Sequence, residues 1–361
     1  MKKTIFLTLF LCLCKVVTGN SGKPDISFAC ELNGSDFAEL FSDTSLVNEL
    51  AEMQVSLVVG LMDFSSERTA AIQMLNEAGI PLVAWLLLPP EEGYWFNMHN
   101  GDKALGRYSD FKKWTKENGL IWKGIGIDLE PDIKDAELAL THPCRMVWKA
   151  YIRLFDRKSL ENGQKRYDEL LSAMKADGFQ VESYIIPLIF KEREKKTTSF
   201  QKLLGVLDVR TEKEIPMLYT SVIDNPGIIP YYHRPDMPIG LGSTGGGVKI
   251  EGFEAPAISW ENLERDLLIA SELTGEIFIF CLETSVKRGF LPKIKNFDFT
   301  QPAPDMHQEV QEQSRIDKWF GIILVILDHP VWLTICLVAI VAGIVFGFYR
   351  LISYLIRKLR G

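Results

Sequence analysis

Histidine is scarce in this sequence, and cysteine forms none of the patterns that hold metal ions. The five histidines stand singly, so they indicate neither a catalytic triad nor a metal site, and the six cysteines include no Cys-x-x-Cys pair. Structural zinc sites need four cysteine or histidine ligands, usually with two of them a few residues apart. The sequence therefore predicts no metal site, and we expect no cofactor.

Excess positive charge is also absent. The chain has 40 lysines and arginines against 47 acidic residues, a formal net charge of −7. A phosphate-binding surface needs the opposite sign, so nucleic acid is not an expected partner. The glycine-rich run 242–247 lacks the Gly-Lys-Ser/Thr ending of a phosphate loop, and we interpret it as a flexible rim.

What is present is the composition of a large globular domain. Hydrophobic residues make up 47% of the chain and charged residues 24%, which is enough apolar material for a sizeable core. One α/β barrel takes about 250 residues plus insertions. The length of 361 residues therefore predicts one such domain with appendages.

The first residues are typical of a secretory signal peptide. Lys2 and Lys3 precede an apolar run over 4–14, and small residues follow up to Gly19. This order predicts a signal peptide over 1–19 that is removed by cleavage. The alternative is an uncleaved anchor, although the run is short for a membrane span and Lys15 interrupts it.

The other end of the chain predicts a transmembrane helix. Residues 331–349 carry no charge, and at about 1.5 Å per residue they match the roughly 30 Å hydrocarbon core of a bilayer. The tail 350–361 is basic, which places it in the cytoplasm by the positive-inside rule. We therefore expect a single-pass protein of the cell membrane. The lipid bilayer holds its C-terminal helix, and the N-terminal domain lies on the extracytoplasmic side.

Two short segments separate the large domain from this helix. Residues 299–318 are polar and contain Pro302 and Pro304, which predicts a juxtamembrane tether after a barrel domain over 20–298. Residues 319–330 begin apolar but are too short to span a membrane. We expect them to lie in the membrane interface, with Trp319 and Trp332 as anchors. A hairpin of two spans is the alternative.

Three cysteines remain in the exported domain once the signal peptide is removed. They are Cys30, Cys144 and Cys281, and this odd number leaves at least one free thiol. Cys30 and Cys281 are either a disulfide or two neighbouring buried thiols.

From Asp25 onward, short apolar runs alternate with amphipathic segments. This alternation is typical of βα units around a parallel sheet. The predicted strands cover 26–31, 55–62, 80–88, 124–129, 181–189, 215–222, 239–241 and 276–282. Eight such units predict a closed (β/α)8 TIM barrel, an α/β fold, and the alternative is an open, doubly wound sheet.

Two carboxylates follow the fourth predicted strand. Because side chains alternate along a strand, Asp128 and Glu130 share one face, and Ile127 and Leu129 share the other. The active sites of such barrels lie at the carboxyl ends of the strands. Neighbouring like charges raise the pKa of at least one carboxyl, as a general acid near neutral pH requires. The alternative is a structural pair, bonded to helix N-termini or to an arginine.

The run 123–130 resembles the fourth-strand signature of the family 18 glycoside hydrolases, the chitinase-like barrels. That signature is written Asp-Gly-x-Asp-x-Asp-x-Glu. Gly124, Asp128 and Glu130 match its glycine, its last aspartate and its glutamate. Lys123 and Gly126 stand in place of its first two acids.

A second likeness lies two strands later. Residues 217–219, Met-Leu-Tyr, resemble the Met-x-Tyr of the family's sixth strand, with Thr220 where the family usually has aspartate. The resemblance implies that Glu130 protonates the leaving oxygen. It also implies that Asp128, helped by the Tyr219 hydroxyl, orients an N-acetyl group of the substrate as that group attacks the anomeric carbon. Met217 would lie beside the substrate.

A mechanism with two carboxylates needs a second acid that faces Glu130 across the scissile bond. Glu283 is the preferred catalytic candidate, because strand eight should lie across the barrel from strand four. Glu31 and Asp63 follow strands one and two, and we assign them to substrate binding. A solvated loop carboxylate is the alternative for each of the three.

Aromatic side chains near the same strand ends are candidates for stacking on sugar rings. Trp95 follows strand three in the loop Gly-Tyr-Trp-Phe-Asn, and Trp85 lies within that strand. Burial in the core is the alternative for Trp85.

Three functions compete at this stage. The first is a membrane-anchored glycosidase, a hydrolase of O-glycosyl bonds, that acts on carbohydrate with Glu130 as general acid. The second is a catalytically inactive chitinase-like barrel that binds glycan or a protein partner, and the replaced acids at 123 and 126 favour it. The third is a metal-dependent phosphodiesterase or deacetylase with Asp128, Glu130 and Asp132 as ligands. The absence of histidine near the other strand ends counts against the third.

Overall fold

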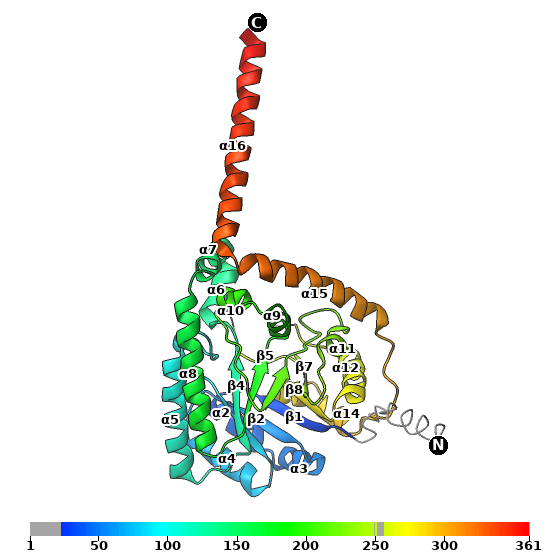
Figure 1. Cartoon of the computed structure of the whole chain (residues 1–361). Helices are drawn as coiled ribbons and strands as arrows, with labels where there is room; N and C mark the ends of the chain where they lie inside the picture. The colour runs from blue at the N-terminus through cyan, green and yellow to red at the C-terminus, as the bar shows by residue number, and fades with distance from the viewer. Residues whose placement is uncertain (1–22, 249, 251–255, 361) are drawn as a thin grey trace, which may run out of the picture.

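The computed structural model describes residues 23–248, 250 and 256–360 (Figure 1). The predicted signal peptide 1–19 lies outside the described residues and stays a prediction.

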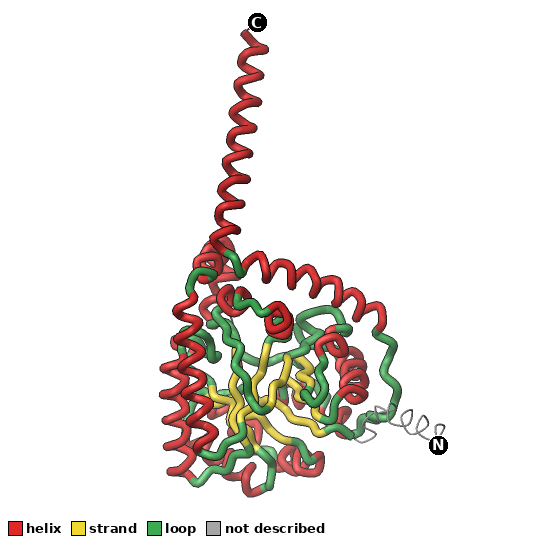
Figure 2. Tube along the Cα trace, viewed as in Figure 1, coloured by secondary structure: helices red, strands yellow, loops and turns green. Residues whose placement is uncertain are grey.

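Eight parallel strands form the centre of the molecule, and helices surround them (Figure 2). The strands lie in the order β6-β5-β4-β3-β2-β1-β8-β7. Their bounds are β1 Asp25–Cys30, β2 Ser56–Leu61, β3 Leu82–Leu86, β4 Gly124–Leu129, β5 Val181–Ile185, β6 Lys213–Pro216, β7 Ile239–Gly242 and β8 Glu276–Phe280. Each strand overlaps a range predicted from the sequence.

The sheet curves into a nearly closed barrel. β1 pairs with both β2 and β8, and the segment after β6 meets β7. There the Leu218 backbone N–H donates to the Gly240 carbonyl oxygen at 2.8 Å. A Cβ added at Gly240 would lie 2.8 Å from the Pro216 carbonyl oxygen, so this approach requires glycine. The predicted TIM barrel is confirmed, and the alternative of an open sheet is wrong.

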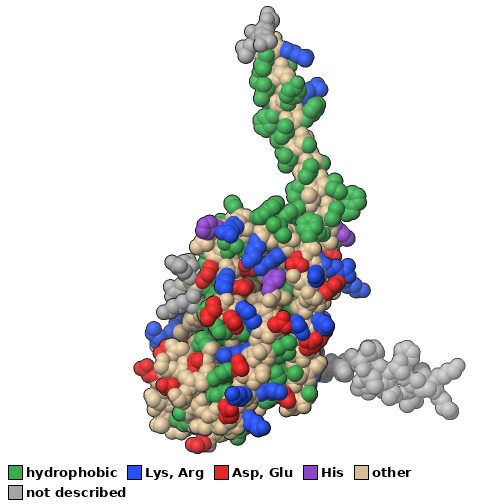
Figure 3. All heavy atoms as spheres, turned by 90° about the vertical axis from the view of Figure 1, so that its left-hand side faces the viewer, with side chains coloured by type: hydrophobic (Ala, Val, Ile, Leu, Met, Phe, Trp, Pro, Cys, Tyr) green, Lys and Arg blue, Asp and Glu red, His purple; other side chains and the backbone are tan. Residues whose placement is uncertain are grey.

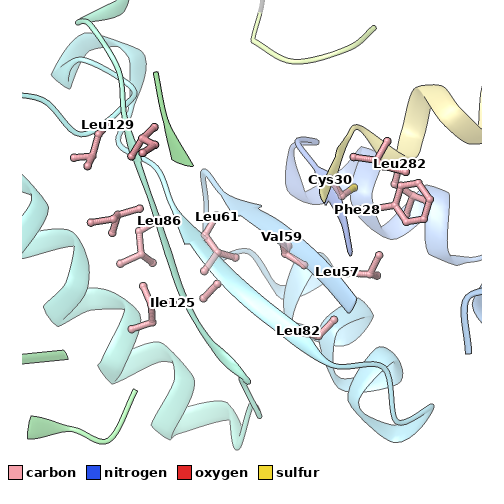
Figure 4. Close-up of a cluster of buried hydrophobic side chains, with 14 of the residues drawn as sticks. Phe28, Cys30, Leu57, Val59, Leu61, Leu82, Leu86, Ile125, Leu129 and Leu282 are labelled. Atoms are coloured by element: carbon pink, nitrogen blue, oxygen red, sulfur yellow. The ribbon is translucent and has the colours of Figure 1, made fainter. Parts of the chain in front are cut away.

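Both faces of the sheet are buried. Leu57, Val59 and Leu61 of β2 point outward, where they join the cluster between strands and helices in Figure 4. Trp85 of β3 and Tyr184 of β5 lie inside the barrel, with ring centroids 5.9 Å apart. Parallel strands that are covered on both faces read as continuous apolar runs, which is why the sequence predicts them well.

Helices cover the outside of the barrel, and local sequence sets their ends. Ser65 caps α4 by accepting the Arg68 backbone N–H, and Gly79, with a φ of 74°, follows the end of that helix. The helices before the C-terminal region are α2 Gly34–Phe41, α3 Thr44–Met53, α4 Ser66–Glu77, α5 Gly101–Asn118, α6 Ile133–Thr141, α7 Pro143–Arg153, α8 Arg157–Ala176, α9 Ile189–Lys195, α10 Ser199–Leu204, α11 Ile228–Tyr232, α12 Trp260–Leu273, α13 Leu282–Lys287 and α14 Leu291–Lys295.

The helical stretch after α6 is divided in two. α7 ends at Arg153 and α8 begins at Arg157. The Asp156 side chain accepts the Ser159 backbone N–H and so begins α8 anew. α7 packs against α6 and α10.

Two helices end the chain. α15 (His307–Leu327) lies along the barrel, and α16 (Pro330–Arg360) projects away from it (Figure 1). Over Pro330–Lys358, α16 is long and apolar enough to cross a membrane, and it is a candidate span. α15 runs through both the predicted tether 299–318 and the predicted interfacial segment 319–330. The domain limits drawn there stay predictions.

Cys30 and Cys281 are buried free thiols. Of the two alternatives that the sequence allows, the structure therefore has neighbouring thiols and not a disulfide.

Candidate active site

Asp128 and Glu130 lie where β4 ends, on the inner face of the barrel. Asp128 is 3% exposed, while Ile127 and Leu129 belong to the outer cluster, as the alternation predicts. The loop after β3 extends the sheet here. The Phe96 backbone N–H donates to the Asp128 carbonyl oxygen at 3.0 Å, and the Glu130 N–H donates to the Phe96 carbonyl oxygen at 3.2 Å. These two bonds fix the backbone that carries both carboxyls.

Glu31 is the third carboxyl at this end of the barrel. It follows β1 directly and is 8% exposed. The Tyr94 hydroxyl donates to its Oε1 at 2.5 Å, and the Val248 backbone N–H donates to the same carboxyl. Glu31 therefore has a fixed position, built by a strand end, a loop tyrosine and the glycine-rich loop.

The three carboxyls hold protons more tightly than isolated carboxyls do. Burial raises the pKa of Glu130 to about 7. Burial also raises the pKa of Asp128, and the charges of Glu130 and Glu31 raise it further. The pKa of Glu31 is raised to about 8 by burial and by the charges of Glu283 and Glu130, against the lowering effect of the Tyr94 hydrogen bond. A general acid that works near neutral pH requires a raised pKa of this kind.

A cavity of about 1150 Å³ opens above these carboxyls. Its volume is somewhat above the usual range of about 300–1,000 Å³ for small-molecule sites. Its walls combine the three acids with the glycine-rich loop and with aromatic side chains from β3, β5, β8 and the segments after β3 and β6. They include Glu31, Trp85, Trp95, Asp128, Glu130, Tyr184, Met217, Tyr219, Phe280 and residues 245–247.

The aromatic walls offer both flat faces and hydrogen-bond donors. The ring of Tyr219 stacks on that of Phe280, with centroids 6.1 Å apart. Burial raises the pKa of Tyr219, as does the charge of Asp128, so its hydroxyl stays protonated and able to donate. Trp85 is 3% exposed, and its indole N–H has no hydrogen-bond partner among the described residues. A buried N–H without a partner is costly, and a ligand oxygen in the cavity would relieve that cost.

The structure explains two of the three departures from the chitinase-like signature, those at Gly126 and Thr220. A Cβ added at Gly126 would lie 2.7 Å from the Tyr184 hydroxyl oxygen, so a tyrosine of β5 fills the space that the signature gives to aspartate. Thr220 is buried and donates to the Asp266 carboxylate of α12, away from the cavity. The family's missing acids therefore have no substitute at the same positions.

Two predicted carboxylates have other partners. Asp63 forms an ion pair with the fully buried Arg68 at 2.9 Å. Burial alone would raise the pKa of Asp63, but hydrogen bonds from Arg68 and Ser65 hold it well below its usual range. Glu283 begins α13 and accepts the Glu31 backbone N–H at 3.3 Å. Neither carboxylate is among the described residues that line the cavity.

Asp132 has a local role. Its carboxylate accepts the Lys134 backbone N–H at 2.9 Å and caps α6. Over the described parts of the chain, no group of three or more histidine, cysteine, aspartate or glutamate side chains is arranged to hold a metal ion.

Sequence reasoning missed Tyr184 and Phe280 as wall residues. The signal for Tyr184 is its register, because it pairs with Asp128 and so points into the barrel at the same height. Phe280 is the last residue of β8. The sequence predicts Glu31 because it too lies at the carboxyl end of a strand. Tyr94 stands in the predicted stacking loop, but no sequence signal pairs its hydroxyl with Glu31.

The sequence matches no protein-family model and no curated protein. Among solved structures, the chain is similar to a GH18 chitinase from Pseudoalteromonas aurantia, with 10% identity, a TM-score of 0.39, and coverage of 75% of this chain and 98% of that one. It is also similar to Saccharomyces cerevisiae Gas2p in complex with laminaritriose and laminaritetraose. There the identity is 11%, the TM-score 0.39, and the coverage 82% of this chain and 68% of that one.

Proposed function

We propose that this protein cleaves a glycosidic bond in the cavity above β4, with Glu130 as the general acid and Asp128 as its partner. The observation that carries the proposal is the cluster of Glu31, Asp128 and Glu130 in one aromatic-lined cavity, where burial raises the pKa of each. Glycoside hydrolysis needs an acid that keeps its proton near neutral pH beside a second carboxyl.

Each carboxyl has a distinct place in this proposal. Glu130, with a pKa of about 7, donates its proton to the leaving oxygen. Asp128, two residues earlier on β4, orients a group of the substrate beside the anomeric carbon, where positive charge develops and water completes the hydrolysis. Glu31 hydrogen-bonds a sugar hydroxyl. Glu283, predicted as catalytic, acts here by holding the Glu31 backbone at 3.3 Å.

The aromatic walls position the sugar. Trp95 is half-buried at the cavity wall, and in this proposal its ring stacks on a sugar. Tyr219 and the unpartnered indole N–H of Trp85 donate to ring or linkage oxygens. Aromatic rings with a polar end suit a ligand that has both apolar C–H faces and hydroxyls.

The decisive experiment is Glu130→Gln in the full chain. Glutamine keeps the shape of the side chain but has no acidic proton, so we expect hydrolysis to fall by about 100-fold to 10,000-fold, the usual contribution of a general acid. Substrates are chitin and laminarin oligosaccharides and aryl glycosides, with released reducing ends as the readout. Glu137→Gln, on the exposed side of α6, is the matched control and keeps full activity. Undiminished hydrolysis by folded Glu130→Gln protein contradicts the assignment.

A barrel that binds glycan without cleaving it is the second candidate. Gly126 and Thr220 favour it, because both replace acids of the chitinase-like signature. The Tyr184 hydroxyl occupies the space beside Gly126, and Thr220 bonds to Asp266 outside the cavity. Saturable oligosaccharide binding in calorimetry, with no released sugar from any substrate in the panel, supports this second function and rejects the first.

For the location of the protein, we propose that α16 spans the cell membrane with the barrel on the extracytoplasmic side. The uncharged run 331–349, within the candidate span Pro330–Lys358, and the basic tail 350–361 support this topology. In sealed cells, an impermeant maleimide should label Ile121→Cys, in a Cys144→Ser/Cys336→Ser background, without lysis, because Ile121 is 69% exposed before β4. Labelling only after lysis places the barrel inside.

A further inference from the structure

α15 turns the polar residues Gln313 and Asp317 toward the protein, followed by Gly321 and Leu324, and it exposes apolar side chains on its outer side. Inward, Asp317 is 2% exposed and accepts hydrogen bonds from Tyr231 at 2.7 Å and Tyr232 at 2.9 Å. Lys191 of α9 adds an ion pair to Asp317 at 2.6 Å. Helices on the surface of a water-soluble protein show the opposite arrangement, with the apolar face inward.

The outer side of α15 is apolar over its second half. Trp319 is 69% exposed and Ile323 is 48% exposed, and both lie on the side of the helix away from Asp317. The other exposed apolar residues of this face are Ile316, Ile322, Val325 and Ile326. The first half of the outer side carries charge instead, with Glu312 and Arg315 exposed. The apolar half is the half next to α16.

α7 repeats the same inverted pattern. Inward, Lys149 and Arg153 each form an ion pair with Asp135 of α6 at 2.5 Å, and Asp135 is 2% exposed. Outward, α7 exposes Val147, Trp148 and Ile152, and Phe155 is exposed just after its end. Arg145 and Lys149 are exposed beside them, and the exposed thiol of Cys144 lies one turn before Trp148.

Both helices adjoin the start of the candidate span. The Tyr151 hydroxyl of α7 and the Thr334 hydroxyl of α16 form a hydrogen bond at 2.5 Å. Residues 328–329 alone separate α15 from α16, and the Asp328 carboxylate accepts the Thr198 N–H at 3.1 Å. Figure 3 shows hydrophobic side chains gathered below α16, above a region rich in lysine, arginine, aspartate and glutamate.

We propose that the outer faces of α7 and α15 lie in the interfacial layer of the bilayer and hold the barrel against the membrane. The occupant is lipid, because both apolar faces are continuous with α16, whose apolar stretch has no part buried in the protein. Helices with one apolar face lie in the plane of a membrane, with that face at the boundary between headgroups and acyl chains. The proposal rests on the proposed span and is independent of catalysis.

The natural thiol of Cys144 provides the test. Full-length protein with Cys336→Ser is labelled at Cys144 with a nitrobenzoxadiazole probe, since Cys30 and Cys281 are buried. It is then reconstituted in phosphatidylcholine vesicles that contain doxyl-labelled lipid. We expect quenching of this probe to exceed that of a control probe by at least about twofold, with shallow doxyl groups more effective than deep ones.

The control probe is placed at the other end of the barrel. Ile121→Cys, in a Cys144→Ser/Cys336→Ser background, lies just before β4 and is 69% exposed, so it is expected to remain in water. A third probe at Trp319→Cys tests α15 in the same way. Equal quenching at 121 and 144 overturns the proposal. Copper-catalysed crosslinking between two copies through Cys144, without lipid quenching, also overturns it and assigns α7 to a contact between protein chains.

Discussion

At the scale of single residues, the raised pKa of Glu130 allows a prediction of how the proposed hydrolysis depends on pH. Its pKa is raised to about 7 by burial, and a general acid acts only while protonated. The acid form is present below that pKa and is lost as pH rises through it. We expect kcat/KM to fall about tenfold per pH unit above pH 7. A rate that stays constant from pH 6 to 9 removes Glu130 from this role.

Glu31 predicts how stability depends on pH. Burial raises its pKa in the folded protein to about 8 from an ordinary value of 4.5. The folded state then binds this proton more tightly than the unfolded state. The stabilisation is complete below the ordinary value and is lost as pH rises through 8. We expect Glu31→Gln, which can still accept the Tyr94 hydrogen bond, to reduce the loss of stability between pH 5 and 9 by at least about 1 kcal/mol.

The measurement is the midpoint of thermal unfolding of both proteins across this pH range, with Glu137→Gln as the exposed control. Identical pH curves for wild type and Glu31→Gln argue against a buried, protonated Glu31.

Gly126 predicts a packing conflict. Its added Cβ would lie 2.7 Å from the Tyr184 hydroxyl oxygen inside the barrel. Overpacking of this kind costs about 1–3 kcal/mol, so Gly126→Ala should lower the free energy of unfolding by that amount. Tyr184→Phe removes the oxygen, and the double variant should recover part of the loss in urea unfolding. Additive effects of the two changes would show that the two side chains do not compete for space.

The sequence allows part of this site to be predicted. Asp128 and Glu130 follow from strand alternation, and Glu31 follows from its place at the end of β1. Asp63 and Glu283 occupy similar positions after β2 and β8, but the chain turns away at once. Arg68, one helical turn into α4, then pairs with Asp63. A sequence pattern predicts where a strand ends, but it does not predict whether the side chain of the next residue points into the cavity.

At the scale of elements, the strands are more predictable than the helices. β4 is buried at all six positions, so its apolar run is unmistakable. The helical pattern of α7 is equally clear, but periodicity alone does not say whether an apolar stripe faces the barrel or faces outward. The buried acid Asp135 decides this, because Lys149 and Arg153 turn toward it. That pairing depends on α6, which the sequence does not connect to α7.

This pairing predicts the effect of Asp135→Ala. Removal of the acid leaves Arg153, 10% exposed at its side chain, without its partner. Breaking a buried ion pair in this way costs about 3 kcal/mol or more. We expect α7 to detach from α6, and amide hydrogen exchange over Pro143–Arg153 to accelerate. Asp102→Ala removes a carboxylate that is 76% exposed and paired with Arg166, and serves as the control. Unchanged exchange in α7 would mean that other contacts hold it.

At the scale of the whole molecule, eight alternating units predict the barrel but not how it closes. β6 ends at Pro216, which has no backbone N–H to donate to a neighbouring strand. Closure therefore depends on the next residues, with Leu218 bonded to Gly240. The sequence shows Pro216 and Gly240, but it does not show that these two residues come together between β6 and β7.

The short connection between α15 and α16 has a consequence for encounter with substrate. Residues 328–329 leave no length for a flexible stalk, and the Asp328 carboxylate is held by the Thr198 N–H. With α16 in a bilayer, the barrel can drift sideways but cannot rise. Collision frequency then depends on the number of molecules per unit area of membrane, and not on their concentration in the surrounding fluid. Under the proposed topology, such a barrel meets substrates that lie on the same membrane surface.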